Sequence, residues 1–150
     1  MIAIGLLALA AAADGRAPVG VFERWGAFRA AGPRRCYAIS RPIRRGDGFA
    51  SIGSFPGLGV RGQLHVRLSR PRDPAARVTL SIGERRFTLR AGSRDAWAGD
   101  AAADRAIVAA MRGARSMSIE SVGARFGPFA DSYALAGAAS AIDAAALACL

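Results

Sequence analysis

The feature that most constrains the fold of this chain is an alternation of apolar and polar residues in short segments separated by turns. The clearest case is segment 78–91, in which a Gly-Glu pair separates two alternating runs. A two-residue loop with glycine first is typical of a type II′ hairpin turn. The hairpin places Leu80 opposite Phe87, and the same register places Val78 opposite Leu89. Apolar residues then pair across the two strands on one face, which favours this register.

Shorter segments with the same rhythm occur along the rest of the chain, and we expect strands at 22–28, 36–40, 49–55, 63–70, 116–122 and 132–135. Two stretches have helical spacing instead. One follows Asp100 or Asp104, either of which can cap it, and ends at Gly113; the other is the Ala-rich stretch 138–148. The sequence predicts a mainly β domain, an antiparallel β-sandwich or bent sheet of about seven strands with two short helices, one of them C-terminal.

The first residues predict export. Residues 1–13 are almost wholly apolar and end in alanines, and the charged residues Asp14 and Arg16 follow. The run is shorter than the roughly 20 residues that cross a bilayer, whereas an apolar stretch before small residues is typical of a signal peptide. We expect cleavage before Asp14, one domain over 14–150, a periplasmic or secreted location, and no transmembrane segment after cleavage. The alternative is a buried N-terminal strand or helix.

The chain has two cysteines, Cys36 and Cys149. In an exported protein an even number of cysteines predicts disulfide pairing, and we expect a Cys36–Cys149 bridge. Cys149 shares the predicted inner face of the last helix with Ile142 and Ala146, and Cys36 opens a short apolar segment. A reactive thiol is the alternative, although no neighbouring histidine or second cysteine would lower the pKa of Cys149.

The basic residues predict affinity for anions. The formal net charge is +10, and all 21 basic residues are arginines. Arginine binds phosphate and carboxylate groups through paired hydrogen bonds. The candidate anion-binding residues are Arg34, Arg35, Arg44 and Arg45, to which Arg67, Arg70, Arg72, Arg85 and Arg86 add. A dispersed, solvated surface that partly reflects coding bias is the alternative.

Other candidate sites have little support. Residues 57–62 match G-x-G-x-x-G, but a strand follows where a dinucleotide site needs a helix, so we interpret the segment as a loop. His65 is the only histidine and lies among outward residues of its strand, which favours a solvated side chain. A hydrolase would need His65 beside an acid and a hydroxyl. We expect no cofactor and no metal, and we expect the large aromatics Trp25, Phe87, Trp97 and Tyr133 in the core.

The spacing of several short motifs resembles a known family. They comprise Trp25, Cys36, the run Asp-Ala-Trp-Ala at 95–98, the helix end Ala-Ala-Met-Arg-Gly at 109–113, the strand Ser-Met-Ser-Ile at 116–119, the segment Ser-Tyr-Ala-Leu-Ala-Gly at 132–137, and Cys149. Together they resemble the invasion-associated locus B family. Members of that family have additional cysteines, so the resemblance implies a divergent relative with a single disulfide.

The resemblance implies a small exported bacterial protein without an established enzymatic activity. We therefore expect a non-enzymatic envelope protein with an interaction or structural role and with envelope or host-surface molecules as partners. The alternative is an Arg-rich anion-binding module for lipopolysaccharide, an acidic glycan or nucleic acid. A hydrolase built on His65 is a third hypothesis.

Overall fold

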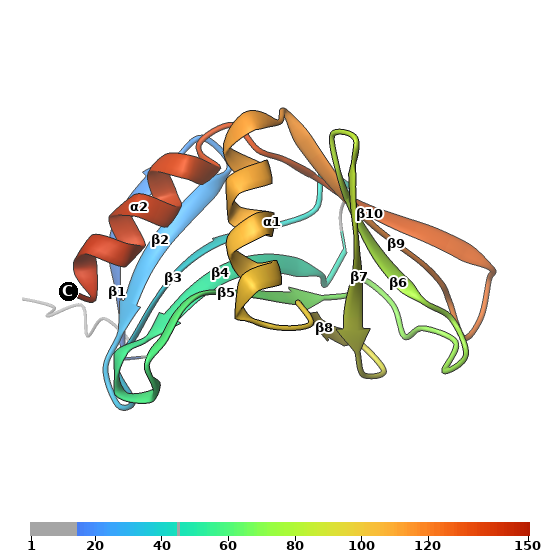
Figure 1. The fold of residues 1–150 in the computed structure, drawn as a ribbon, viewed down its shortest axis with the longest axis horizontal. Coiled ribbons are helices and arrows are strands. Elements are labelled where there is room, and N and C mark those ends of the chain that lie inside the picture. Colours follow the sequence, from blue (N-terminus) through green and yellow to red (C-terminus); the bar gives the residue numbers. More distant parts are fainter. Residues whose placement is uncertain (1–14, 45) are drawn as a thin grey trace, which may run out of the picture.

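A computed structural model gives the fold of residues 15–44 and 46–150 (Figure 1). The predicted signal peptide and Arg45 lie outside these residues. The described part has ten strands, two α-helices and one 3-10 turn. The strands are β1 (Arg16–Phe22), β2 (Trp25–Ala30), β3 (Arg35–Ser40), β4 (Phe49–Phe55), β5 (Val60–Arg67), β6 (Val78–Ile82), β7 (Arg85–Ala91), β8 (Asp95–Trp97), β9 (Ser116–Val122) and β10 (Pro128–Ala134). The helices are α1 (Ala101–Gly113) and α2 (Ala138–Ala148), and the 3-10 turn is η1 (Pro56–Leu58).

All the strands belong to one antiparallel sheet, in the order β1-β2-β3-β4-β5-β8-β7-β6-β9-β10. The sheet curls into a half-barrel, and both helices lie in its hollow (Figure 1). The mainly β prediction is confirmed. The sequence left two architectures open, a β-sandwich and a bent sheet, and the structure has the bent sheet. The sheet has ten strands, so the predicted count of about seven is too low. A right-handed strand twist accumulates across many neighbours and curls one long sheet, so a second sheet is not required.

The hairpin predicted at 78–91 is confirmed as β6 and β7. Leu80 pairs with Phe87 and Val78 pairs with Leu89, as the apolar pattern indicates. Gly83 has a φ of 55°, the positive value that the first residue of a type II′ turn requires. Local alternation and turn chemistry agree here, which explains why this register is readable from sequence.

The N-terminal strands differ from the prediction. Residues 22–28 are not one strand: β1 ends at Phe22, the chain turns, and β2 begins at Trp25. The turn includes Glu23 at a φ of 55°, a conformation that sequence seldom signals for a glutamate. The three-residue strand β8 was also not predicted, because so short an element shows no periodicity of its own.

Both helices form where the sequence predicts them. Asp100, rather than Asp104, caps α1, and its side chain accepts a hydrogen bond from the amide of Ala103 at 2.7 Å. Asp104 lies inside the helix, where its carboxylate accepts the amide of Leu64 at 2.9 Å and ties α1 to β5. The helix α2 packs over β1–β4. The α1 helix covers β5 and the β6–β7 hairpin.

The end of β10 forms hydrogen bonds with β2 and with the loop after β3. The indole nitrogen of Trp25 in β2 donates to the carbonyl of Ala134 in β10 at 2.8 Å. The amide of Ile43, which follows β3, donates to the carbonyl of Ser132 at 2.7 Å. At the start of α2, Gly137 has a φ of 85°, and a Cβ there would stand 2.0 Å from the carbonyl oxygen of Phe22. Only glycine permits α2 to begin so close to the end of β1.

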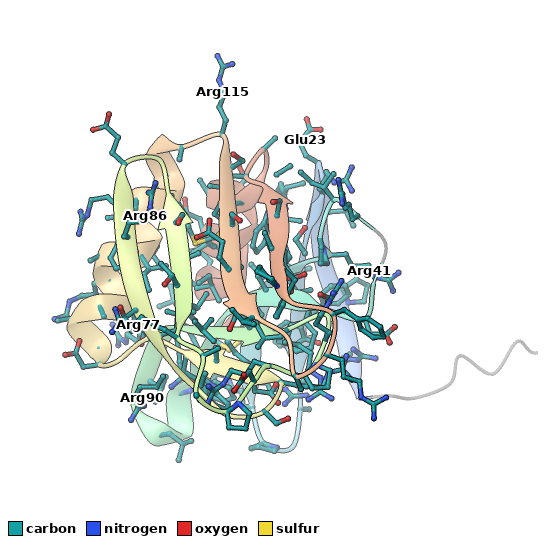
Figure 2. All side chains as sticks on the ribbon, turned by 90° about the vertical axis from the view of Figure 1, so that its right-hand side faces the viewer. Glu23, Arg41, Arg77, Arg86, Arg90 and Arg115 are labelled. Atoms are coloured by element: carbon teal, nitrogen blue, oxygen red, sulfur yellow. A yellow bond between two sulfur atoms is a disulfide. The ribbon has the colours of Figure 1, made fainter. Side chains whose placement is uncertain are left out.

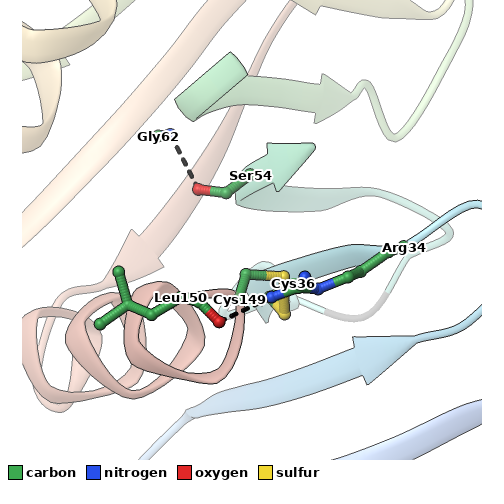
Figure 3. The surroundings of a disulfide bond; sticks show 6 residues. All are labelled: Arg34, Cys36, Ser54, Gly62, Cys149 and Leu150. Carbon is green, nitrogen blue, oxygen red and sulfur yellow. Dashed lines mark hydrogen bonds between the residues drawn. A yellow bond between two sulfur atoms is a disulfide. The ribbon is translucent and has the colours of Figure 1, made fainter. Parts of the chain in front are cut away.

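The inner face of β2–β4 carries small residues. Ala27, Ala38 and Ala50 are fully buried, and the alanines of α2 pack toward them. Short side chains on both surfaces allow the helix to approach the sheet closely. The predicted disulfide between Cys36 and Cys149 is confirmed and joins β3 to the end of α2 (Figure 3).

Candidate functional site

Both helices lie on one side of the sheet (Figure 1). The opposite, outer face of β2–β5 and β8 carries a cluster of large side chains. Along β3, Cys36, Ala38 and Ser40 point inward and are buried, whereas Tyr37 and Ile39 point outward and are half-buried. The same alternation on neighbouring strands gives a set that we call the outer aromatic face, consisting of Phe28, Tyr37, Ile39, Phe49, Phe55, His65 and Trp97. No described helix covers it.

The rings of the outer aromatic face form two groups of contacts, one across β4, β5 and β8 and the other between β2 and β3. His65 in β5 stacks on Trp97 in β8, with ring centroids 5.3 Å apart and planes 5° from parallel. Phe49 in β4 meets His65 edge to face at 5.1 Å. Phe28 and Tyr37 form a second stacked pair at 5.7 Å. These offset and edge-to-face arrangements are the favourable geometries for aromatic pairs, so the rings hold each other in place.

Glycines let some rings lie flat against the sheet. A Cβ at Gly26 would stand 2.8 Å from the Phe28 ring, so that ring occupies the space of a side chain two residues earlier. Gly53 on β4 is less restrictive, because a Cβ there would make ordinary contacts, at 3.5 Å from the Phe55 ring and 3.6 Å from the Cβ of Tyr37. A ring that lies along the backbone turns one broad surface to the sheet and the other toward solvent. Such a surface suits a flat ligand.

Two adjoining hollows indent this face. The larger, of about 770 Å³, lies beside β1 and the 41–48 loop, and the smaller, of about 340 Å³, lies over β4, β5 and β8. Tyr37, Ile39 and Phe49 line both hollows, which therefore adjoin. The charged side chains among the lining residues are Arg16, Arg24, Arg35, Arg41 and Asp47. Four cations against one acid give the hollows a positive character.

His65 is not the solvated side chain that the sequence favours. Its Nε2 lies 2.8 Å from Asp95 Oδ1, and the other oxygen of Asp95 accepts a hydrogen bond from Arg67 at 2.8 Å. The acid therefore fixes the imidazole against Trp97. Ser51 lies opposite His65 in the register, but its hydroxyl donates to the His65 main-chain carbonyl at 3.3 Å. Among the described residues, no hydroxyl forms a hydrogen bond with the imidazole, so the geometry is that of a positioned ring.

The three predicted anion-binding arginines that the structure describes, Arg34, Arg35 and Arg44, do not form one cluster. Arg34 and Arg35 lie where β3 begins, and Arg44 lies in the loop after β3 ends. Six residues of strand separate these ends by roughly 20 Å. Arg34 donates to the main-chain oxygen of Leu150 at 2.8 Å (Figure 3), on the helix side of the sheet. Arg35 joins the outer aromatic face, with its guanidinium 5.7 Å from the centre of the Tyr37 ring.

The remaining arginines are distributed widely. Figure 2 shows Arg41, Arg77, Arg86, Arg90 and Arg115 pointing away from different sides of the molecule. Some that the sequence adds to the anion-binding set have structural roles instead. The Arg72 guanidinium donates to the carbonyls of Asp73, Pro74, Ala76, Ala91 and Gly92, and so holds two loops together. The hypothesis of a dispersed arginine surface holds for most of the molecule, and the outer hollows are the exception.

The glycine-rich segment 57–62 does not lead into a helix. Its first half lies in and after η1, between β4 and β5, as the loop interpretation expects, whereas residues 60–62 already belong to β5. In the part of the chain that the structure describes, no three histidine, cysteine or acidic side chains come close enough to hold a metal ion. Within the same residues, no helix has the length and apolar character needed to cross a membrane.

The expectation that all four large aromatics lie in the core is partly wrong. Trp25 and Tyr133 are fully buried, and Phe87 packs against the core, but Trp97 lies half-buried on the outer aromatic face. The signal for this face was present in the sequence. Aromatic residues occupy the polar positions of the alternation in β3, β4 and β5, where a solvated sheet normally has small or charged residues.

No protein-family model matches this chain, and neither a curated protein nor a solved structure matches it significantly.

Proposed function

We propose that this protein is an exported, non-enzymatic envelope protein that binds an acidic glycan on its outer aromatic face. The single observation that carries the proposal is the uncovered aromatic cluster with arginine-lined hollows beside it. A large apolar patch that a monomer leaves uncovered usually marks a binding site. The resemblance to the invasion-associated locus B family supports the same cellular setting and supplies no ligand.

The aromatic rings account for affinity. Sugar rings have apolar C–H faces, and burying such a face against Trp97, Tyr37 or Phe28 removes apolar surface from water. The rings are already fixed by their neighbours, so binding costs little side-chain entropy. The fixation of His65 by Asp95 belongs to this preorganisation, because it keeps the Trp97 partner in place.

The arginines account for the acidic character of the ligand. Arg35 lies beside Tyr37, and Arg16, Arg24 and Arg41 line the larger hollow. A guanidinium matches the geometry of a carboxylate or sulfate through two parallel hydrogen bonds. Aromatic faces next to guanidinium groups therefore suit a chain of sugars that carries regularly spaced anions.

The covalent structure supports the exported setting. Disulfides persist in oxidising compartments, so the Cys36–Cys149 bridge is compatible with a location outside the cytoplasm. In such a location an acidic polysaccharide is a more available polyanion than nucleic acid, which is why we favour the glycan among the anions that the charge alone permits.

The test is fluorescence anisotropy with a labelled heparin oligosaccharide as the acidic glycan. We expect Trp97→Ala and Tyr37→Ala each to weaken binding about threefold to tenfold, the range of one aromatic contact. Phe126→Ala is the matched control, because Phe126 is 89% exposed and lies outside both hollows. For charge, Arg35→Ala is compared with Arg115→Ala, which removes an equally exposed guanidinium elsewhere.

Two results would contradict the proposal. Equal affinity of the Trp97, Tyr37 and Phe126 variants would show that heparin binds through diffuse charge alone. Tighter binding of single-stranded oligothymidylate than of heparin, lost in the same aromatic variants, would assign the face to nucleic acid instead.

A further inference from the structure

A third cavity lies on the opposite side of the sheet, between the two helices and the β4–β5 hairpin. Its volume is about 620 Å³, which is within the usual range for small-molecule sites. It exists because the facing helices carry short side chains there. Ala109 of α1 and Ala145 and Ala146 of α2 line it and leave the space between the helices unfilled.

The walls of this helix cleft are mostly apolar. Val108 of α1 and Ile142 of α2 face it from the two helices, and Ile52 of β4 lines it from the sheet. The Cys36–Cys149 disulfide and Leu150 border it at the end of α2 (Figure 3). Leu150 is 86% exposed, and Leu58 in the hairpin beside the cleft is 78% exposed. Apolar surface thus extends from the interior to the opening.

Three arginines also line the cleft, and no acidic residue does. Arg112 forms an ion pair with Asp143 at 2.7 Å. The guanidinium groups of Arg61 and Arg105 form no hydrogen bond or ion pair with any described residue, and both side chains are exposed. Asp104, the one acidic residue within α1, is buried, faces β5 and accepts a hydrogen bond from the amide of Leu64. Two guanidinium groups therefore remain available at an apolar cleft.

We propose that the helix cleft binds a free single-chain amphiphile with an anionic headgroup, of the long-chain fatty acid type. The tail lies between Val108 and Ile142 over Ile52, and the carboxylate lies at Arg61 and Arg105. Burial of the tail tightens binding about fourfold for each methylene group. The guanidinium groups bind the headgroup by charge-assisted hydrogen bonds, which select an anion over a cation. This site is separate from the outer aromatic face.

The test is isothermal titration calorimetry of the disulfide-bonded protein with monomeric dodecanoate. Dodecyltrimethylammonium, which has the same tail and the opposite charge, is the control ligand. We expect one dodecanoate site and at least about tenfold weaker binding of the cation. We expect the double variant Arg61→Glu/Arg105→Glu to bind dodecanoate about tenfold more weakly or worse, and Arg115→Glu, on a distant turn, to bind it as the wild type does.

A filling variant provides independent evidence for the location. Ala109 is exposed at the cleft, so Ala109→Trp places a large ring there without replacing a core residue, and we expect it to abolish binding. Near-ultraviolet circular dichroism checks that each variant is folded. If Ala109→Trp does not fold, the charge-reversal pair alone decides, since both arginines are exposed. The proposal is overturned if dodecanoate does not bind, if neither set of variants weakens it, or if the cation binds equally well.

Discussion

The two faces of strands β2–β5 are built from the same strands and yet follow opposite designs. On the inner face, small residues such as Ala38 and Ala50 are fully buried under α2. On the outer face, Tyr37 and Phe49 alternate with them and remain half-buried. The inner side chains under α2 are mostly short, which lets the helix approach the sheet closely. The outer side chains are large, and no described helix covers them.

The two faces therefore contribute differently to stability and to binding. Buried side chains of the inner face contribute most of the free energy of folding, because they are removed from water and closely packed. The outer rings are partly exposed, and the surface that remains in contact with water is available to a ligand. Substitutions on the two faces should therefore separate into losses of stability and losses of affinity.

The largest effect is expected from the two tryptophans. Trp25 is fully buried and donates to Ala134, so Trp25→Ala should lower the free energy of unfolding by about 3–5 kcal/mol. Trp97→Ala should lower it by less, because the ring is only partly buried and its stacking on His65 adds about 1 kcal/mol to that partial burial, while the substitution weakens glycan binding. Urea denaturation measures both losses. Similar losses for the two variants would refute the division between the faces.

The next effect is expected from the disulfide, which joins the inner side of β3 to α2. The bridge closes a loop of 113 residues, and Cys36→Ser/Cys149→Ser should lower the free energy of unfolding by about 2–4 kcal/mol. Denaturation of the wild type with and without a reductant measures the same quantity. While the reduced protein remains folded, binding to the outer aromatic face should be unchanged. A parallel loss of glycan affinity would show that the two faces are coupled.

Two helical aspartates should give opposite dependence on pH. Burial raises the pKa of Asp104 above its ordinary 3.8, so the folded protein holds that proton more tightly and loses stability as pH rises through the titration. The Arg112 guanidinium lowers the pKa of the exposed Asp143, which therefore loses its stabilising effect as pH falls. Relative to wild type, Asp104→Asn should gain stability with rising pH and Asp143→Asn should lose it. Thermal unfolding between acid and neutral pH measures both, and slopes of the same sign would contradict this assignment.

The smallest effect is expected at the two tyrosines. The Tyr133 hydroxyl is buried, has no hydrogen-bond partner among the described residues, and has its pKa raised by burial. Tyr133→Phe should therefore leave stability unchanged or raise it by about 1 kcal/mol. Tyr37→Phe, on the outer aromatic face, should be close to neutral because water solvates that hydroxyl. Calorimetric melting temperatures compare them, and a marked destabilisation by Tyr133→Phe would mean that the inner hydroxyl has a partner such as buried water.

Local patterns explain what could be predicted. The register of the β6–β7 hairpin, the extent of α2 and the pairing of the two cysteines follow from turn chemistry, helical spacing and cysteine number. The β1–β2 turn could not be predicted, because it depends on Glu23 in a conformation that its sequence does not favour. Part of the candidate site was readable in the outward position of His65, but its contacts with Asp95 and Trp97 were not, since those residues lie 30 or more positions away.

Residue types and short-range spacing are enough to predict the mainly β character, the two helices, the disulfide and the strong positive charge. Which face of β3 and β4 the helices cover depends on the tertiary structure. Alternating residue types along a strand indicate that its two faces differ. They do not indicate which face is buried when both faces carry apolar residues. The curl of the sheet, the glycine-limited start of α2 and the bridge at Cys149 fix the helices on the small-residue face. The aromatic residues are left outside for that physical reason.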